Sequence, residues 1–244
     1  FYKESLKFVE AGRLDVHLEE NPVEDVDLSD WSDLDKRSQK AQESKEDVTY
    51  LTSEQVEELV ENVGSPKLRN ELIVRLLFQT GLRCGELVNT RVDDVDTDSR
   101  EMRVHSQKSH RNRVVYYQPS LDVLMNQWLN GGYRDSLVPA SDSPYLFPTY
   151  QSEQISEYSI TRIVSTAAEE MGLQEVYGTD MNGNDRHKIT AHTLRHSFAV
   201  AALKGGMNVR TLQKALGHSK LETTEVYLDL AEEDVKEAFS RLEI

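Results

Sequence analysis

The feature that most limits what this chain can fold into is a series of segments in which apolar residues recur every three or four positions. That spacing places them on one face of an α-helix, and several of these segments end at a glycine, a common helix stop. The pattern predicts helices over residues 52–63, 68–80, 120–130, 159–171, 192–204, 208–216 and 231–242, with a short one over 83–89. A chain of 244 residues with this pattern can bury a sizeable core.

Residues 92–118 are predicted to form two or three short strands, with turns at Asp98-Ser99 and Ser109-His110. Residues 174–190 are polar and are predicted to form a long loop with Asn182-Gly183 at its tip. The expected fold class is therefore α+β, mainly α with one small antiparallel β-sheet.

The first 48 residues differ in composition from the rest of the chain. Residues 1–20 fit the end of a helical module that Asn21-Pro22 breaks, and residues 23–48 have the acidic, polar composition of a solvated linker. Thr52 and Gln55 have the spacing of a capping box and mark the first helix of the main part. We therefore predict two parts, residues 1–48 and 49–244. Because Phe1 is not an initiator methionine, we expect a fragment of a longer protein.

The net charge of -15 argues at first against a polyanionic partner, but the charge is unevenly distributed. Residues 1–62 hold 18 acids and 7 bases, whereas the 35 residues from Arg186 to Lys220 hold seven bases and no acid. Basic runs are usually solvated surface, yet binding to phosphates depends on the local face rather than on the global sum. The candidate contacts for a polyanion are Arg111, Arg113, Lys188, Lys204, Arg210, Lys214 and Lys220.

Composition also excludes several classes of protein. No apolar run approaches the roughly 18 residues that a membrane-spanning helix needs, and no segment resembles a secretory signal, so no membrane association is expected. The single cysteine, Cys84, excludes an internal disulfide. That cysteine content fits a reducing cytoplasm.

Four local patterns carry side chains suited to phosphate chemistry. Arg83 follows a predicted helix stop, where free backbone N–H groups and a guanidinium can bind one phosphate, and Glu86 is close enough to orient it. Lys108 is predicted at a hairpin tip. His192 and Arg195 share one helix face, and His218 precedes Tyr227 by nine residues. Taken singly, each has an ordinary alternative: a surface salt bridge, a solvated lysine or a packed tyrosine.

The spacing of His192 and His196 also raises the possibility of a zinc site. The residue after His192 is Thr193 rather than the glutamate that a metalloprotease helix uses, and the sequence offers no clear third ligand. We therefore expect no metal and no other cofactor. His196 is predicted to be a structural, hydrogen-bonded residue of the core.

The order of these groups is more specific than any one of them. The phrases Thr-Gly-Leu-Arg-x-Gly-Glu-Leu, His-x-Leu-Arg-His-Ser-Phe-Ala and Leu-Gly-His-Ser-x-x-x-Thr-Thr-x-x-Tyr occur in succession between Leu51 and Leu230. In this respect the chain resembles the tyrosine recombinase or phage integrase family, and its Xer-type members most closely. It departs from the family pattern at Ala191, where many members have proline, and in the length of the loop over 174–190.

The resemblance implies the fold of a tyrosine recombinase catalytic domain over residues 49–244, preceded by the tail of a helical core-binding domain. It implies that Tyr227 attacks a DNA phosphodiester, that Arg83, Arg195 and His218 bind the phosphate, and that His192 assists removal of the tyrosine proton. Lys108 would protonate the leaving 5′ oxygen, and Glu86 would orient the site. The implied partner is double-stranded DNA, bound by a homotetramer on two duplexes.

Two other interpretations stay open at this point. A type IB topoisomerase uses nearly the same groups to relax DNA, although the phrase Leu-Gly-His-Ser favours a recombinase. A catalytically silent DNA-binding regulator could have the same fold, although such a protein has no chemical need for six intact reactive groups.

Overall fold

The computed structural model describes residues 48–105, 112–137, 143–179, 185–218, 220–221 and 223–231. The chain divides into two units, Phe1–Asp47 and Val48–Ile244, and all of the described residues belong to the second. Several predicted features lie outside them: Lys108, Arg111, the turn at Ser109-His110, the loop tip at Asn182-Gly183 and the helix over 231–242 beyond Ala231.

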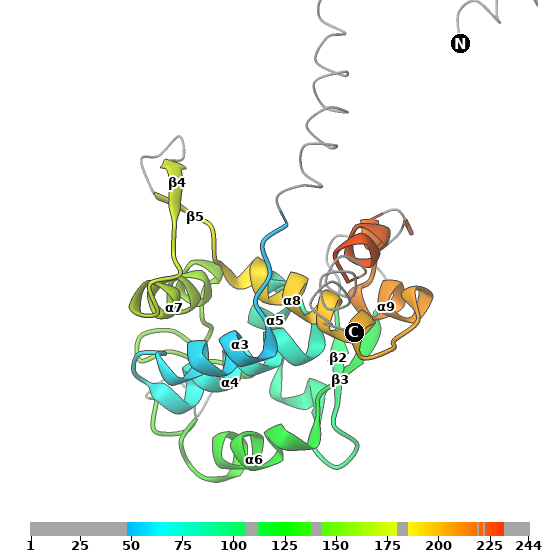
Figure 1. Ribbon diagram of the computed structural model, residues 1–244. Coiled ribbons are helices and arrows are strands. Elements are labelled where there is room, and N and C mark those ends of the chain that lie inside the picture. Colours follow the sequence, from blue (N-terminus) through cyan, green and yellow to red (C-terminus); the bar gives the residue numbers. More distant parts are fainter. Residues whose placement is uncertain are drawn as a thin grey trace, which may run out of the picture. The chain divides into compact units, whose positions relative to one another are not determined.

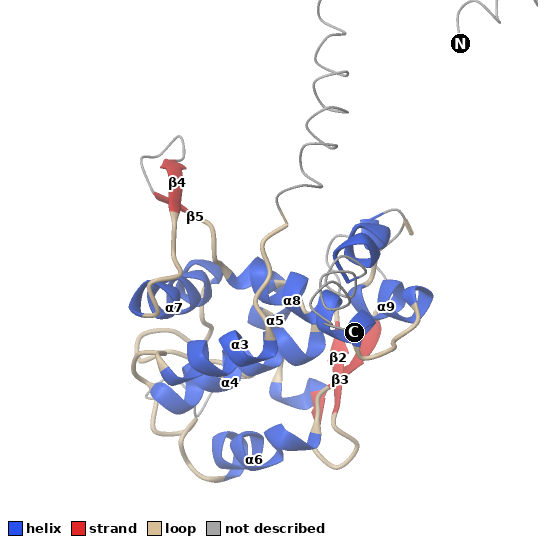
Figure 2. Cartoon of the chain, in the orientation of Figure 1, coloured by secondary structure: helices blue, strands red, loops and turns tan. Residues whose placement is uncertain are grey.

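The described unit is mainly helical, as the apolar spacing predicts (Figures 1 and 2). Thr52 forms the predicted capping box with Gln55 at the first helix, and Gly81 and Gly217 end two others in the left-handed conformation. The helices are α3 (Ser53–Glu61), α4 (Lys67–Thr80), α5 (Cys84–Val88), α6 (Asp122–Asn130), α7 (Glu157–Glu170), α8 (Ala191–Lys204) and α9 (Val209–Leu216). Residues 223–231 form one more helix, which the sequence pattern does not predict.

The predicted small sheet has three antiparallel strands in the order β1-β2-β3. These are β1 (Val95–Asp96), β2 (Glu101–Val104) and β3 (Arg113–Tyr116), and residues 97–100 form the predicted turn between the first two. Met102 and Val115 are cross-strand partners, and both side chains are buried. The pairing of β2 with β3 makes a hairpin whose connecting residues include Lys108.

The prediction of one long loop over residues 174–190 is wrong. The strands β4 (Val176–Thr179) and β5 (Asp185–His187) pair antiparallel there and project as an arm in Figure 1. Both Val176 and Tyr177 are exposed, so this arm contributes little to the core. Its sequence therefore lacks the alternation of apolar and polar residues by which a half-buried strand is predicted. Backbone pairing, rather than burial, forms this second sheet.

The core is centred on α4, whose Leu72, Ile73, Leu76 and Leu77 are fully buried. This helix packs against α3, α6, α7 and α8, and its C-terminal end lies close to α5 and α8. A second cluster consists of Ala199 and Val200 of α8, Leu212 and Leu216 of α9, and Tyr227. The two clusters bring the end of α4, the start of α5, α8, α9 and the helix over 223–231 to one region.

Candidate active site

The first part of the candidate site is the junction between α4 and α5. Gly81 has φ 62°, and a Cβ there would collide with the Phe198 ring of α8. Glycine is therefore required both by backbone conformation and by space. The chain turns at Gly81 so that Arg83 becomes the N-cap residue of α5, one position before the predicted first turn.

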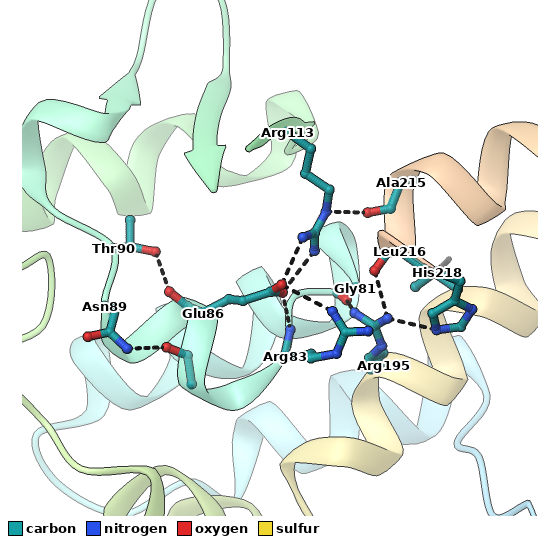
Figure 3. A network of polar contacts seen from close by, with 11 residues as sticks. Gly81, Arg83, Glu86, Asn89, Thr90, Arg113, Arg195, Ala215, Leu216 and His218 are labelled. Carbon is teal, nitrogen blue, oxygen red and sulfur yellow. Dashed lines mark hydrogen bonds and ion pairs between the residues drawn. The ribbon is translucent and has the colours of Figure 1, made fainter. Parts of the chain in front are cut away.

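Glu86 joins two arginines in this region (Figure 3). Its carboxylate accepts the Arg83 backbone N–H at 2.8 Å and Arg83 Nη1 at 3.2 Å. It also accepts Arg113 Nη1 and Nη2, each at 2.8 Å. Burial raises the pKa of Glu86, but the hydrogen bonds from Arg113 and Arg83 outweigh this and hold the pKa below its usual value. Glu86 is therefore an ionised residue that fixes both guanidinium groups.

Arg113 is placed differently from a surface contact. Its side chain is only 11% exposed, and its Nε donates to the Ala215 carbonyl of α9 at 2.8 Å. The same guanidinium lies against Gly217, where a Cβ would be 3.0 Å from Nη1. Arg113 thus ties β3 to both α5 and α9, which favours an internal role over the DNA contact predicted for it.

Among the predicted catalytic residues that the structure describes, Arg195 is the most enclosed, with 1% of its surface exposed. Its Nη1 donates to the Gly81 carbonyl at 2.6 Å, and its Nη2 donates to the Leu216 carbonyl at 2.8 Å. Nη2 also lies 2.9 Å from His218 Nε2. Burial, together with repulsion by Arg83, lowers the pKa of Arg195 to about 10, so it remains charged at neutral pH.

His218 completes this part of the site. Because Arg195 can only donate, His218 Nε2 must accept, which leaves the proton on Nδ1, 2.9 Å from Thr224 Oγ1. Burial and the charge of Arg195 lower the pKa of His218 to about 4, which agrees with this neutral tautomer. In this arrangement His218 Nε2 is an acceptor, and it can donate to a phosphate only after the ring is protonated or changes tautomer.

Tyr227 lies beside α8 with 5% of its surface exposed. Its hydroxyl is 2.8 Å from His196 Nδ1, while His192 is exposed and meets the His196 ring edge-on at a centroid distance of 4.4 Å. Burial raises the pKa of Tyr227, and the charges of Arg195 and Arg83 oppose that rise. His196 has the hydrogen bond expected of a structural residue, but its partner is the predicted nucleophile.

The five other predicted basic contacts that the structure describes are on the surface. Lys188 pairs with Glu175 at 3.0 Å, and Lys204 lies over the Tyr50 ring at 5.5 Å from its centroid. Arg210 and Lys214 are exposed one turn apart on α9, and Lys220 is also exposed. These five positions could face a polyanion.

Sequence reasoning missed two kinds of site component. The carbonyls of Gly81 and Leu216 hold Arg195, and backbone acceptors leave no trace in residue type. Thr224, which contacts His218, is not among the predicted site residues, although its place in the Thr-Thr phrase before Tyr227 is a usable signal. In the part of the chain that the structure describes, no group of three His, Cys, Asp or Glu residues could hold a metal ion. No helix among the described residues is long and apolar enough to cross a membrane.

Comparison with known proteins assigns the chain to a family. Residues 49–234, more than half of the chain, match the Phage integrase family, and the chain belongs to it. It is 32% identical over 195 residues to the tyrosine recombinase XerA of Pyrococcus furiosus, covering 78% of this chain and 60% of the relative. It is 31% identical over 195 residues to the tyrosine recombinase XerC of Corynebacterium glutamicum, covering 78% and 58%.

Solved structures agree with this assignment. The crystal structure of XerA recombinase is similar with a TM-score of 0.65 and 28% identity, over 80% of this chain and 66% of that one. A XerH site-specific recombinase bound to a palindromic difH substrate, at 22% identity and a TM-score of 0.63, shares the fold over 81% of this chain and 54% of that one. The predicted fold class is confirmed. The chain spans about 60% of the length of these curated relatives.

Proposed function

We propose that this chain carries the catalytic domain of a site-specific DNA recombinase, which cuts and rejoins strands through a 3′-phosphotyrosine on Tyr227. The observation that carries the proposal is that separate segments bring four of the predicted residues together. Arg195 contacts His218, Tyr227 contacts the residue after Arg195, and the charges of Arg195 and Arg83 act on the Tyr227 phenol. Residues 49–244 would form this domain, and residues 1–48 the tail of a preceding core-binding domain with an acidic linker. The names of the relatives and the DNA complexes among the structural neighbours support this function.

The residue types fit phosphoryl transfer without a metal. The Tyr227 oxygen attacks phosphorus, the bond from phosphorus to the 5′ oxygen breaks, and the phosphate stays on the tyrosine. Arg83 and Arg195 stabilise the charge that develops on the non-bridging oxygens. His192 assists departure of the phenolic proton, and Lys108 supplies a proton to the 5′ oxygen. Rejoining reverses these transfers, with a second strand's 5′ hydroxyl as the nucleophile.

The degree of exposure suggests how a phosphate enters. The Arg83 side chain is 43% exposed, so it is the open member of the pair, whereas Arg195 is enclosed. A phosphate that reaches Arg83 can approach Arg195 by replacing His218 Nε2 as an acceptor for Nη2. His218, released from Arg195, could then bind the same phosphate.

Double-stranded DNA is the proposed partner, and Lys188, Lys204, Arg210, Lys214 and Lys220 are the proposed basic contacts of the described residues. Lys108 and Arg111 would add contacts from the β2–β3 hairpin. We propose a homotetramer on two duplexes as the active assembly. The cytoplasm is the proposed site of action, consistent with a chain whose only cysteine is Cys84.

A suicide substrate, in which a nick releases the 5′ end after cleavage, tests the proposal. We expect wild-type protein to become covalently attached to DNA, also in EDTA, and Tyr227→Phe to bind DNA without attachment. Tyr158→Phe, which changes an exposed tyrosine, is the matched control and should behave as wild type.

Four outcomes would count against the proposal. A covalent adduct in the Phe variant would point to another nucleophile. Loss of activity in EDTA that magnesium restores would overturn the metal-free mechanism. DNA binding by the wild type without any adduct would favour the silent regulator, and supercoil relaxation without junction resolution would favour a topoisomerase.

A further inference from the structure

In the described structure, the proposed nucleophile Tyr227 contacts a side chain to which the family resemblance assigns no role. Tyr227 OH lies 2.8 Å from His196 Nδ1, and the two ring centroids are 5.6 Å apart. The resemblance assigns removal of the proton to His192, but the His192 ring contacts the His196 ring. We propose that His196 is a positioning residue, which binds the Tyr227 hydroxyl and directs its oxygen toward the phosphate. This inference rests on the proposed function.

The surroundings of His196 keep its ring neutral. The titratable and charged groups around it are His192 and Arg195 on the same helix, His218 after α9, and Tyr227 from the facing helix. Burial, and then repulsion by His192, Arg195 and His218, lower the pKa of His196 to about 3. A neutral imidazole has one nitrogen that accepts a hydrogen bond, and such a ring adds no further positive charge beside Arg195.

Which atom donates depends on the His196 tautomer, and the tautomer with its proton on Nε2 gives the direction that suits catalysis. When Nδ1 accepts, the Tyr227 O–H points at His196, and the lone pairs of the oxygen are left facing away from the ring. Arg195 and Arg83 act on the same phenol, since their charges favour its ionised form. In this tautomer His196 accepts the Tyr227 proton in the hydrogen bond, and the charges of the two arginines favour the ionised oxygen. This is the arrangement expected of a nucleophile held before attack.

The packing around the ring supports positioning rather than structure alone. The His196 ring meets the exposed His192 ring edge-on, and Tyr227 is buried in one cluster with Leu212, Leu216 and Val200. The apolar cluster would hold a phenylalanine equally well. The hydrogen bond between His196 and Tyr227 therefore acts on the hydroxyl and not on the packing of the ring.

Variants at position 196 test this in single-turnover cleavage of a suicide substrate. His196→Ala is expected to cleave about tenfold more slowly, the effect of one lost hydrogen bond, with DNA affinity within about twofold of wild type. His196→Asn places an amide oxygen or nitrogen at the branch occupied by Nδ1, so it should recover most of the rate. His187→Ala, which changes a histidine of β5, is the control and should match wild type.

A substrate with sulfur in place of the bridging 5′ oxygen separates the two sides of the reaction, because a thiolate leaves without needing a proton. The His196→Ala defect should persist on this substrate, whereas a Lys108→Ala defect should disappear. A His196→Ala rate equal to wild type would overturn the proposal. A folded His196→Asn variant as slow as His196→Ala would also overturn it and would mark His196 as a proton acceptor. A His196→Ala defect that disappears on the sulfur substrate would overturn it as well. If wild-type protein forms no adduct at all, the proposed function fails instead.

Discussion

Arg113 gives the sharpest prediction, because the structure and the sequence pattern suggest different roles for it. Replacement by alanine would remove two hydrogen bonds to Glu86 and one to the Ala215 carbonyl. The side chains of Arg113 and Glu86 are 11% and 8% exposed, so the carboxylate would be left nearly buried with Arg83 alone. Removing one partner of a buried pair costs about 3–5 kcal/mol. Because Arg83 remains, we expect a loss of about 2–3 kcal/mol in the free energy of unfolding.

Thermal unfolding measures this loss. For a domain of this size, the expected decrease in melting temperature is about 4–12 °C. Glu86→Gln removes the buried charge, so the double variant Glu86→Gln, Arg113→Ala should be less destabilised than the sum of the single variants. The folded pKa of Glu86 is lowered, so its ionised pair stabilises the fold above its unfolded pKa and loses that effect as pH falls through the folded pKa. The difference between wild type and Arg113→Ala should therefore shrink in acid.

The salt dependence of DNA binding tests the alternative role of Arg113, a direct contact with a DNA phosphate. If Arg113 were a phosphate contact, alanine would lower the slope of log affinity against log salt by about one unit and leave stability nearly unchanged. A variant that melts with wild type and shows that smaller slope would refute the internal role. If the internal role is correct, the salt slope should stay the same, while cleavage falls because Glu86 and Arg83 shift.

Three further predictions concern the same region. Arg83→Ala should lower the cleavage rate about a hundredfold with little change in melting temperature, whereas Arg195→Ala should lower both, since it leaves two carbonyls unpaired. Replacing Arg210 and Lys214 together should weaken binding to specific and unrelated DNA alike and reduce the salt slope, which titration at several salt concentrations would measure. At a pH below the usual histidine pKa of 6.5, His196 and His218 bind protons in the unfolded chain but stay neutral in the folded protein. The free energy of unfolding should therefore decrease as the pH is lowered, by up to about 1.4 kcal/mol per pH unit for each histidine. His196→Asn should lessen the slope of melting temperature against pH between 6 and 5.

The helical part of the fold could be predicted because burial repeats with the helical period. Leu72, Ile73, Leu76 and Leu77 lie on one face of α4, and all four are in the core. The helix over 223–231 could not be predicted in this way. Its Thr223, Thr224 and Val226 are β-branched and favour other conformations, so the tertiary packing of Tyr227 must override local preference.

The membership of the candidate site was also accessible from sequence, but its contacts were not. The order of reactive residues predicted that Arg83, Arg195, His218 and Tyr227 would meet. Nothing in that order distinguishes His192 from His196 as the neighbour of the tyrosine, because both are on α8 and only the position of the facing helix decides. A buried arginine and a DNA-binding arginine likewise look the same in sequence, as Arg113 illustrates.

Burial and the positive charges of the site keep His196 and His218 neutral, and a bound anion would oppose the effect of those charges. Arg83, Arg113 and Arg195 contribute three positive charges, and the Glu86 carboxylate that contacts two of them offsets one. Burial, and then the charges of these arginines, keep the pKa of His218 at about 4, far below neutrality. A bound phosphodiester would add a negative charge beside the arginines, and an anion favours the protonated form of a nearby histidine. The pKa of His218 should therefore rise when DNA binds, which would turn the acceptor seen here into a donor for the phosphate. On this account the site becomes fully charged for catalysis only when its substrate is present, even though the chain as a whole is strongly acidic.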